Sequence, residues 1–252
     1  MIEHTYTEPV SKLLFMGRPD HQGWSDFLKM GITKADIPEL IRLLEDTDLR
    51  WMEKPDDVLE EDEDLTEWYG QIHAWRALAQ LKAEEAIPAL LSILYEIDEY
   101  GDDWYGEESC EVFPMIGPAA IRPLAEYLAD NKHGTWARVA ASASLQKMVD
   151  AYPETKEECA AAVVVALLDY KENDEAVNGS LISDLVYMDA AREHLDLIEE
   201  AFKSGNVDES LDGDFEDLQI TLRLRKKRSK PHLNPFFFDG DRMLIDRGHP
   251  II

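Results

Sequence analysis

The chain has 252 residues, of which 45% are hydrophobic, and this is enough to bury a sizeable core in one large domain or two small ones. Asp and Glu number 53 against 25 Lys and Arg, which gives a formal net charge of −28. A surface this negative repels nucleic-acid phosphates and anionic lipids, so we expect neither as a partner. Basic proteins and cations are the natural counterparts.

The cysteine content and the apolar runs indicate where the protein works. Cys110 and Cys159 are its two cysteines, too few for a disulfide framework or a four-thiolate zinc site. The first residues lack the basic and apolar regions of a signal peptide. No apolar run reaches the roughly 18 residues that a membrane helix needs. The sequence therefore predicts a cytoplasmic protein without a membrane anchor.

Amphipathic helical patterns follow one another from Trp24 to Arg225. Segments 35–46, 83–97 and 117–130 repeat apolar residues at i, i+3, i+4 and i+7. Each also has a proline in its first turn, where helix amides lack an intrahelical partner. These prolines are Pro38, Pro88, and Pro118 or Pro123.

The segments between these helices are predicted to be helical as well. One helix spans Thr66–Leu81, with Thr66 as its N-cap. A second spans Thr135–Tyr152, with an inner side of Val139, Ala143 and Met148. Segments 156–170 and 190–205 are expected to be second helices of later pairs, and the last of them ends at Gly205.

Four tryptophans mark a repeat along the chain. Trp24, Trp68, Trp104 and Trp136 are predicted to open successive first helices, at intervals of 44, 36 and 32 residues. Irregular periods of this length, with two helices each, predict an all-α fold. We interpret residues 1–222 as an α-solenoid of about five helical hairpins.

The last segment, 223–252, is predicted to be an irregular tail. Six of the 25 basic residues lie between Arg223 and Lys230, and an aromatic, proline-containing stretch follows. We expect the basic part to strap the protein's own acidic loops, since the chain is so acidic. The aromatic part is too apolar for a solvated segment, so we expect it to dock on the solenoid.

Two resemblances support the helical interpretation. The helix at 75–79, a short loop and then 86–91 resemble HEAT-type repeats, in particular the short variety first named from phycobilisome lyases. This resemblance covers residues 24–170 and implies paired helices, which occur in lyases, scaffolds and regulators. The stretch 136–222 is similar to a bacterial all-helical family of unknown function, which implies no activity.

One loop has the residue spacing of a calcium site. Asp208, Ser210, Asp212 and Asp214 stand at the ligand positions of an EF-hand-like loop, with a glycine at its turn. The closing position is Gln219, which cannot supply a bidentate carboxylate. We therefore expect an acidic loop that caps the next helix, and no metal or other cofactor.

The remaining polar features suggest structure or partner binding. The acidic clusters Asp56–Asp64 and Asp98–Glu108 complement the N-terminal ends of helices, and could also meet a basic partner or a cation. Cys110 lies among acids, which would raise the pKa of its thiol. Arg76 and Arg138 each lie near a tryptophan and are expected to pair with carboxylates of a neighbouring repeat or to face a ligand.

A Trp-Tyr-Gly triplet occurs twice, at 68–70 and 104–106, each time where an acidic loop becomes a helix. Its tryptophans, together with Trp24 and Trp136 at comparable helix starts, are expected to wedge between hairpins, with the glycine allowing close approach. If Tyr69 and Tyr105 are both exposed on one edge, that edge is where a partner is expected. The candidate partner-binding residues are Trp68, Tyr69, Trp75, Arg76, Trp104, Tyr105, Trp136 and Arg138.

Since no catalytic constellation is recognisable, we predict a non-enzymatic scaffold or regulator that binds a protein through its concave or acidic surface. One alternative is a lyase-type enzyme or cofactor chaperone that holds a small molecule in the solenoid groove. The other is an acidic mimic of nucleic acid, which only the net charge supports.

Overall fold

The computed structural model describes residues 5–20, 23–50 and 67–229. Within these residues the fold is all-α: eleven α-helices are joined by short 3₁₀ turns, and no strand occurs. The helices are α1 (Ile37–Leu44), α3 (Tyr69–Gln80), α4 (Ile87–Ser92), α5 (Tyr95–Tyr100), α6 (Asp103–Ile116), α7 (Ile121–Ala129), α8 (Thr135–Ala151), α9 (Lys156–Leu167), α10 (Glu175–Tyr187), α11 (Leu195–Ser204) and α12 (Phe215–Thr221). The all-α prediction is confirmed.

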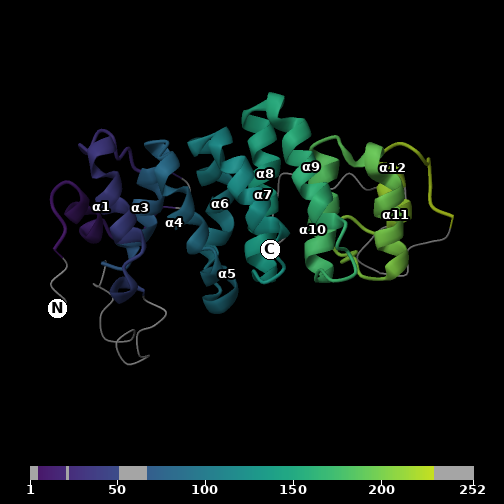
Figure 1. The fold of residues 1–252 in the computed structure, drawn as a ribbon, viewed down its shortest axis with the longest axis horizontal. Coiled ribbons are helices and arrows are strands. Elements are labelled where there is room, and N and C mark those ends of the chain that lie inside the picture. The colour runs from purple at the N-terminus through teal and green to yellow at the C-terminus, as the bar shows by residue number, and fades with distance from the viewer. Residues whose placement is uncertain (1–4, 21–22, 51–66, 230–252) are drawn as a thin grey trace.

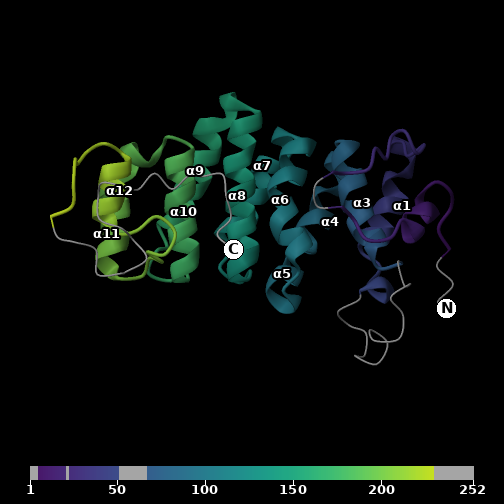
Figure 2. The same ribbon diagram turned by 180° about the vertical axis from the view of Figure 1, so that it is seen from behind.

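The helices stand side by side along the long axis of the molecule, in nearly the order of the chain. Figures 1 and 2, taken from opposite sides, agree on this row, which runs from α1 at one end to α11 and α12 at the other. The α-solenoid remains our interpretation of this row.

Two layers of helices make up the row. In the first layer α3, α6, α8 and α10 pack against one another in turn, and in the second α4, α7 and α9 do the same. Contacts between α7 and α8, α8 and α9, and α9 and α10 join the layers. A continuous core of apolar side chains runs from Val10 near one end to Leu222 near the other.

The local signals set most helix boundaries as predicted. Pro38 and Pro88 lie in the first turn of α1 and α4. Gly205 follows α11 with a φ of 76°, the left-handed conformation that glycine adopts most easily. Trp104 and Trp136 are each the second residue of a first-layer helix.

Three local predictions are wrong. No α-helix begins at Trp24, which lies in an irregular segment ahead of α1. Helix α3 begins at Tyr69 instead of residue 66, with Trp68 at the N-cap position, and the predicted cap, Thr66, lies outside the described residues. On α8, Met148 is fully buried as predicted, but Val139 and Ala143 are only partly buried, and Ala137, Ala141 and Leu145 complete the inner side.

The described part of the tail folds back on α12. Arg228 pairs with Asp214 (2.5 Å) and Asp217 (2.5 Å), and Arg225 with Glu216 (2.9 Å). The basic segment therefore straps acidic residues of its own chain, as predicted. The aromatic stretch and its expected docking lie outside the described residues, as does the acidic cluster Asp56–Asp64. Among the described helices, none combines the length and apolar character needed to cross a bilayer.

Candidate binding face

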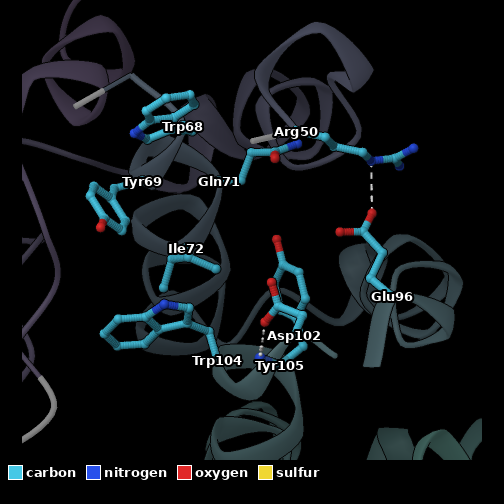
Figure 3. Close-up of a pocket in the computed structure, with 9 residues that line it drawn as sticks. All are labelled: Arg50, Trp68, Tyr69, Gln71, Ile72, Glu96, Asp102, Trp104 and Tyr105. Carbon is cyan, nitrogen blue, oxygen red and sulfur yellow. Dashed lines mark hydrogen bonds and ion pairs between the residues drawn. The ribbon is translucent and has the colours of Figure 1, made fainter. Parts of the chain in front are cut away.

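The two Trp-Tyr-Gly triplets meet at one pocket between α3 and α6, which Figure 3 shows in close-up. Trp68 and Tyr69 come from the start of α3, and Trp104 and Tyr105 from the first turn of α6. We call this the α3–α6 pocket. Its lining consists of Arg50, Trp68, Tyr69, Gln71, Ile72, Glu96, Asp102, Trp104 and Tyr105.

Close packing holds the start of α3 against the first 3₁₀ turn, Val10–Phe15. Gly70 is buried, and a Cβ at this position would lie 2.8 Å from the side chain of Leu14 in the first 3₁₀ turn. The glycine of the first triplet thus permits the close approach that we predicted. The matching Gly106 has more room, since its nearest neighbour, Ile97, would lie at 3.6 Å.

The polar side of the α3–α6 pocket is ordered by an ion pair. Arg50 Nε lies 2.7 Å from Glu96 Oε1, and both side chains are largely buried (Figure 3). Gln71, on α3, donates from Nε2 to the backbone oxygens of Leu44 and Asp46, each at 2.9 Å. These contacts hold the polar wall in a fixed arrangement.

Asp102 is the second carboxylate of this pocket. It is 6% exposed and caps α6, where its Oδ1 accepts a hydrogen bond from the Tyr105 amide at 3.0 Å. Burial raises the pKa of the Asp102 carboxyl, although bonds from the Tyr105 and Trp104 amides oppose the shift. Among the described residues, no cationic side chain forms an ion pair with Asp102.

A groove adjoins the pocket on the other side of α6. We call it the α6–α8 groove. Its lining consists of Ile97, Gly101, Asp102, Asp103, Gly106, Glu107, Trp136, Val139, Ala140 and Ala143. Its cavity volume is about 410 Å³, against about 20 Å³ in the pocket. Asp102 lines both, and we call the pocket and the groove together the binding face.

Trp136 stands on the wall of this groove with 55% of its surface exposed. The start of α8 is fixed by Asp98, whose carboxylate accepts hydrogen bonds from the amides of Trp136 (2.9 Å) and Ala137 (2.8 Å). The indole is therefore presented to solvent from a fixed backbone. This corrects the prediction that it wedges between hairpins.

Arg76 is buried next to the pocket and has a structural role, since it joins α3 to α6. Its guanidinium is 1% exposed and makes a bidentate pair with Glu108 of α6, with Nε 2.9 Å from Oε2. The rings of Trp24 and Trp104 lie on it, with centroids 5.2 and 5.4 Å from Cζ. The predicted pairing with a neighbouring repeat is therefore present for Arg76.

Arg138 differs from Arg76. It is also buried, but donates to the Leu128 carbonyl and to Asn173 Oδ1, both at 2.9 Å, instead of to a carboxylate. Burial lowers the pKa of its guanidinium. Its predicted carboxylate partner is thus replaced by neutral oxygen acceptors.

The eight candidate residues divide by exposure. Trp136 is exposed, and Trp68, Tyr69 and Trp104 are half-buried on the face just described. The other four are buried, each with at most 4% of its surface exposed, namely Trp75, Arg76, Tyr105 and Arg138. Tyr105 at 1% exposure shows that the two triplets do not present equivalent tyrosines.

In the loop with the spacing of a calcium site, the carboxylates of Asp208 and Asp214 bind groups of the protein itself. Asp208 accepts from the Ser210 amide, and Asp214 caps α12 and pairs with Arg228. Asp212 holds one buried oxygen without a hydrogen-bond partner. Throughout the described part of the chain, no cluster of three or more His, Cys, Asp or Glu side chains is arranged to hold a metal ion.

Two further reactive side chains are placed unfavourably for chemistry. Burial, followed by the charge of Glu111, raises the pKa of the half-buried Cys110 thiol, as predicted. His73 is buried, its Nε2 lies 2.9 Å from the Gly17 carbonyl oxygen, and burial lowers the pKa of its ring. His73 is therefore shielded from solvent, and Cys110 is shielded in part.

Comparison with known proteins gives a family. A family model described as "protein of unknown function (DUF1186)" matches residues 29–233. This chain belongs to that family. The DUF1186 match extends well beyond the stretch 136–222 on which the sequence resemblance rested, and HEAT-type repeats stay a prediction. Searches of curated proteins and of solved structures gave no match.

Several residues of the face were missed by sequence reasoning. Asp102 and Glu107 lay within a recognised acidic cluster, but nothing singled them out from their neighbours. Arg50 and Glu96 are 46 positions apart, so their pairing had no local signal. The small residues Ala140 and Ala143 follow Trp136 at helical spacing, and this pattern beside an exposed aromatic could have indicated a groove.

Proposed function

We propose that this protein is a non-enzymatic binding module that recognises a basic protein segment in the α6–α8 groove. The observation that carries this proposal is Trp136, a large aromatic side chain exposed on a rigid backbone beside a concave surface. Exposed aromatic anchors of this kind are enriched at protein interfaces, where they provide large contact area at low entropic cost.

The electrostatics of the groove favour a basic partner. Asp103 and Glu107 project from α6 with exposed side chains, and Asp102 lies at the base. No basic side chain is among the groove's lining residues. With a chain charge of −28, the long-range field also attracts basic partners and raises their association rate.

The groove's floor is suited to a segment of chain. Val139, Ala140 and Ala143 form an apolar strip along α8, and Gly106 faces it from α6. Small side chains leave space for a partner's backbone to approach closely. An extended or helical segment would place apolar residues on this strip and basic residues beside the α6 carboxylates.

The test is capture of partners from a lysate of the source organism, using wild type, Trp136→Ala and Leu168→Ala. Leu168 is a matched control because it is 60% exposed and follows α9, in the other layer. We expect a saturable, salt-sensitive basic partner that wild type and L168A retain and W136A loses. Equal retention by all three would contradict the proposal.

A second variant tests the charge. Glu107→Lys reverses one exposed carboxylate of the groove, whereas Glu111→Lys makes the same change one turn later on α6, outside the groove lining. We expect E107K to weaken capture of that partner much more than E111K does. Equal effects would assign the interaction to net charge alone, as the nucleic-acid mimic alternative requires.

A further inference from the structure

We propose that the α3–α6 pocket binds the ammonium group of a lysine side chain on the protein partner. This inference rests on the proposed function and names the chemistry that the partner brings to the adjoining pocket. Three half-buried aromatic side chains, Trp68, Tyr69 and Trp104, line the pocket together with the carboxylate of Asp102 (Figure 3). Aromatic faces around a carboxylate are a recognised receptor for ammonium groups.

Of the two carboxylates that line the pocket, that of Asp102 has no oppositely charged partner among the described residues. Glu96 is already paired with Arg50 at 2.7 Å. Asp102 is 6% exposed and is stabilised by backbone amides but by no cation among the described residues. A buried carboxylate without a counter-charge is costly, and an incoming ammonium would supply that charge.

The aromatic walls attract the same ligand. A cation over an aromatic face is attracted by the ring's quadrupole, and more strongly where water is excluded. The fold already uses this interaction next to the pocket, since Arg76 Cζ lies 5.2 Å from the ring centroid of Trp24 and 5.4 Å from that of Trp104. Trp104 thus contributes to one cation site within the core and lines the wall of the pocket.

Size favours a lysine over a longer segment of chain. The pocket has a cavity volume of about 20 Å³, against about 410 Å³ in the groove, which is room for one group the size of a water molecule or an ammonium. Lysine is a compact point charge on a flexible apolar stem, so its ammonium can enter the pocket beside Asp102 while its methylenes pack against the half-buried rings. The rest of the partner segment would lie in the α6–α8 groove, which Asp102 joins to the pocket.

The experiment uses the full-length chain labelled with ¹⁵N and follows the indole signals of its tryptophans. The probes are a capped Gly-Ser-Lys-Ser-Gly peptide, its norleucine analogue, and ammonium chloride at matched ionic strength. We expect the lysine peptide to shift the Trp68 and Trp104 signals in a saturable way. Norleucine has no charge and ammonium chloride has no stem, so both should leave the two signals in place.

Two variants test the carboxylate. Asp102→Asn keeps the helix cap, because Asn is as good an N-cap as Asp, and it removes the charge. We expect it to weaken lysine-peptide binding by about tenfold or more, the effect of losing one good charged contact. Asp103→Asn, which changes the neighbouring exposed carboxylate outside the pocket lining, should weaken binding less than about threefold.

The outcomes distinguish binding in the α3–α6 pocket from binding in the α6–α8 groove. A lysine peptide that shifts Trp136 but neither Trp68 nor Trp104 would leave the groove intact and overturn the pocket. Equal shifts from norleucine, or from ammonium chloride, would overturn recognition of a lysine. Binding that survives D102N unchanged would overturn the role of Asp102, and no shift at any indole would overturn the inference outright.

Discussion

Replacing Arg76 should reveal how strongly the face depends on its buried support. In Arg76→Met the apolar stem is largely kept, but Glu108 is left buried without its cation, at 7% exposure. Breaking one side of a buried ion pair costs about 3–5 kcal/mol, because the remaining charge is uncompensated. Loss of the contacts with Trp24 and Trp104 adds to this, so we expect a decrease of about 4 kcal/mol in the free energy of unfolding.

Urea unfolding followed by far-ultraviolet circular dichroism measures this change. With a urea dependence of about 3 kcal/mol per molar, a loss of 4 kcal/mol lowers the midpoint by more than about 1 M. The matched control is Arg122→Met, which removes an exposed pair with Glu126 on α7 and should leave the midpoint nearly unchanged.

The double variant Arg76→Met, Glu108→Leu separates charge from packing. It removes the stranded carboxylate, and apolar replacements of buried ion pairs are often neutral or stabilising, so we expect it to recover most of the lost stability. A single variant within about 1 kcal/mol of wild type would refute the reasoning, since the stranded charge should cost at least 3. So would a double variant as unstable as the single one.

Three further predictions concern other parts of the fold. Gly179→Ala on α10 should destabilise by about 1–3 kcal/mol in urea unfolding, because its Cβ would lie 2.8 Å from the Asp208 carbonyl oxygen, whereas Gly106→Ala should be neutral or slightly stabilising. Burial raises the pKa of Asp184 from 3.8 to about 7, so folding retains a proton there and stability should fall as pH rises between about 4 and 7. Asp184→Asn should remove this part of the pH dependence, by up to about 4 kcal/mol between those limits, and an unchanged profile would contradict it. Arg228→Gln should speed amide exchange in α12 but not in α4, because it releases the strap from Asp214 and Asp217.

The sequence predicts the helices well because their signals are local. Proline in a first turn, as at Pro38, and glycine after a last turn, as at Gly205, act through the backbone of a few neighbouring residues. The failure at Trp24 has a different cause. A tryptophan has no local preference that fixes a helix start, so spacing alone was a weak guide there.

The face could be predicted only in part, because it depends on contacts between distant residues. The sequence pointed to both triplets, but Tyr105 is buried with its ring 5.0 Å from that of Trp75 on α3, whereas Tyr69 is half-buried, and this contact joins residues 30 positions apart. Arg76 pairs with Glu108 across 32 positions, which no helical periodicity reveals. The exposure of Trp136 likewise depends on which side of α8 meets α6 and α10.

Hydrogen exchange on the protein with and without its captured partner tests the central claim most directly. If a basic segment binds in the α6–α8 groove, amides in 103–107 and 136–143 should gain protection on binding, and amides in α9 and α11 should not. W136A should show no such gain at the same partner concentration. Protection confined to α9 and α11, with 103–107 and 136–143 unchanged, would contradict the claim that this groove is the binding site.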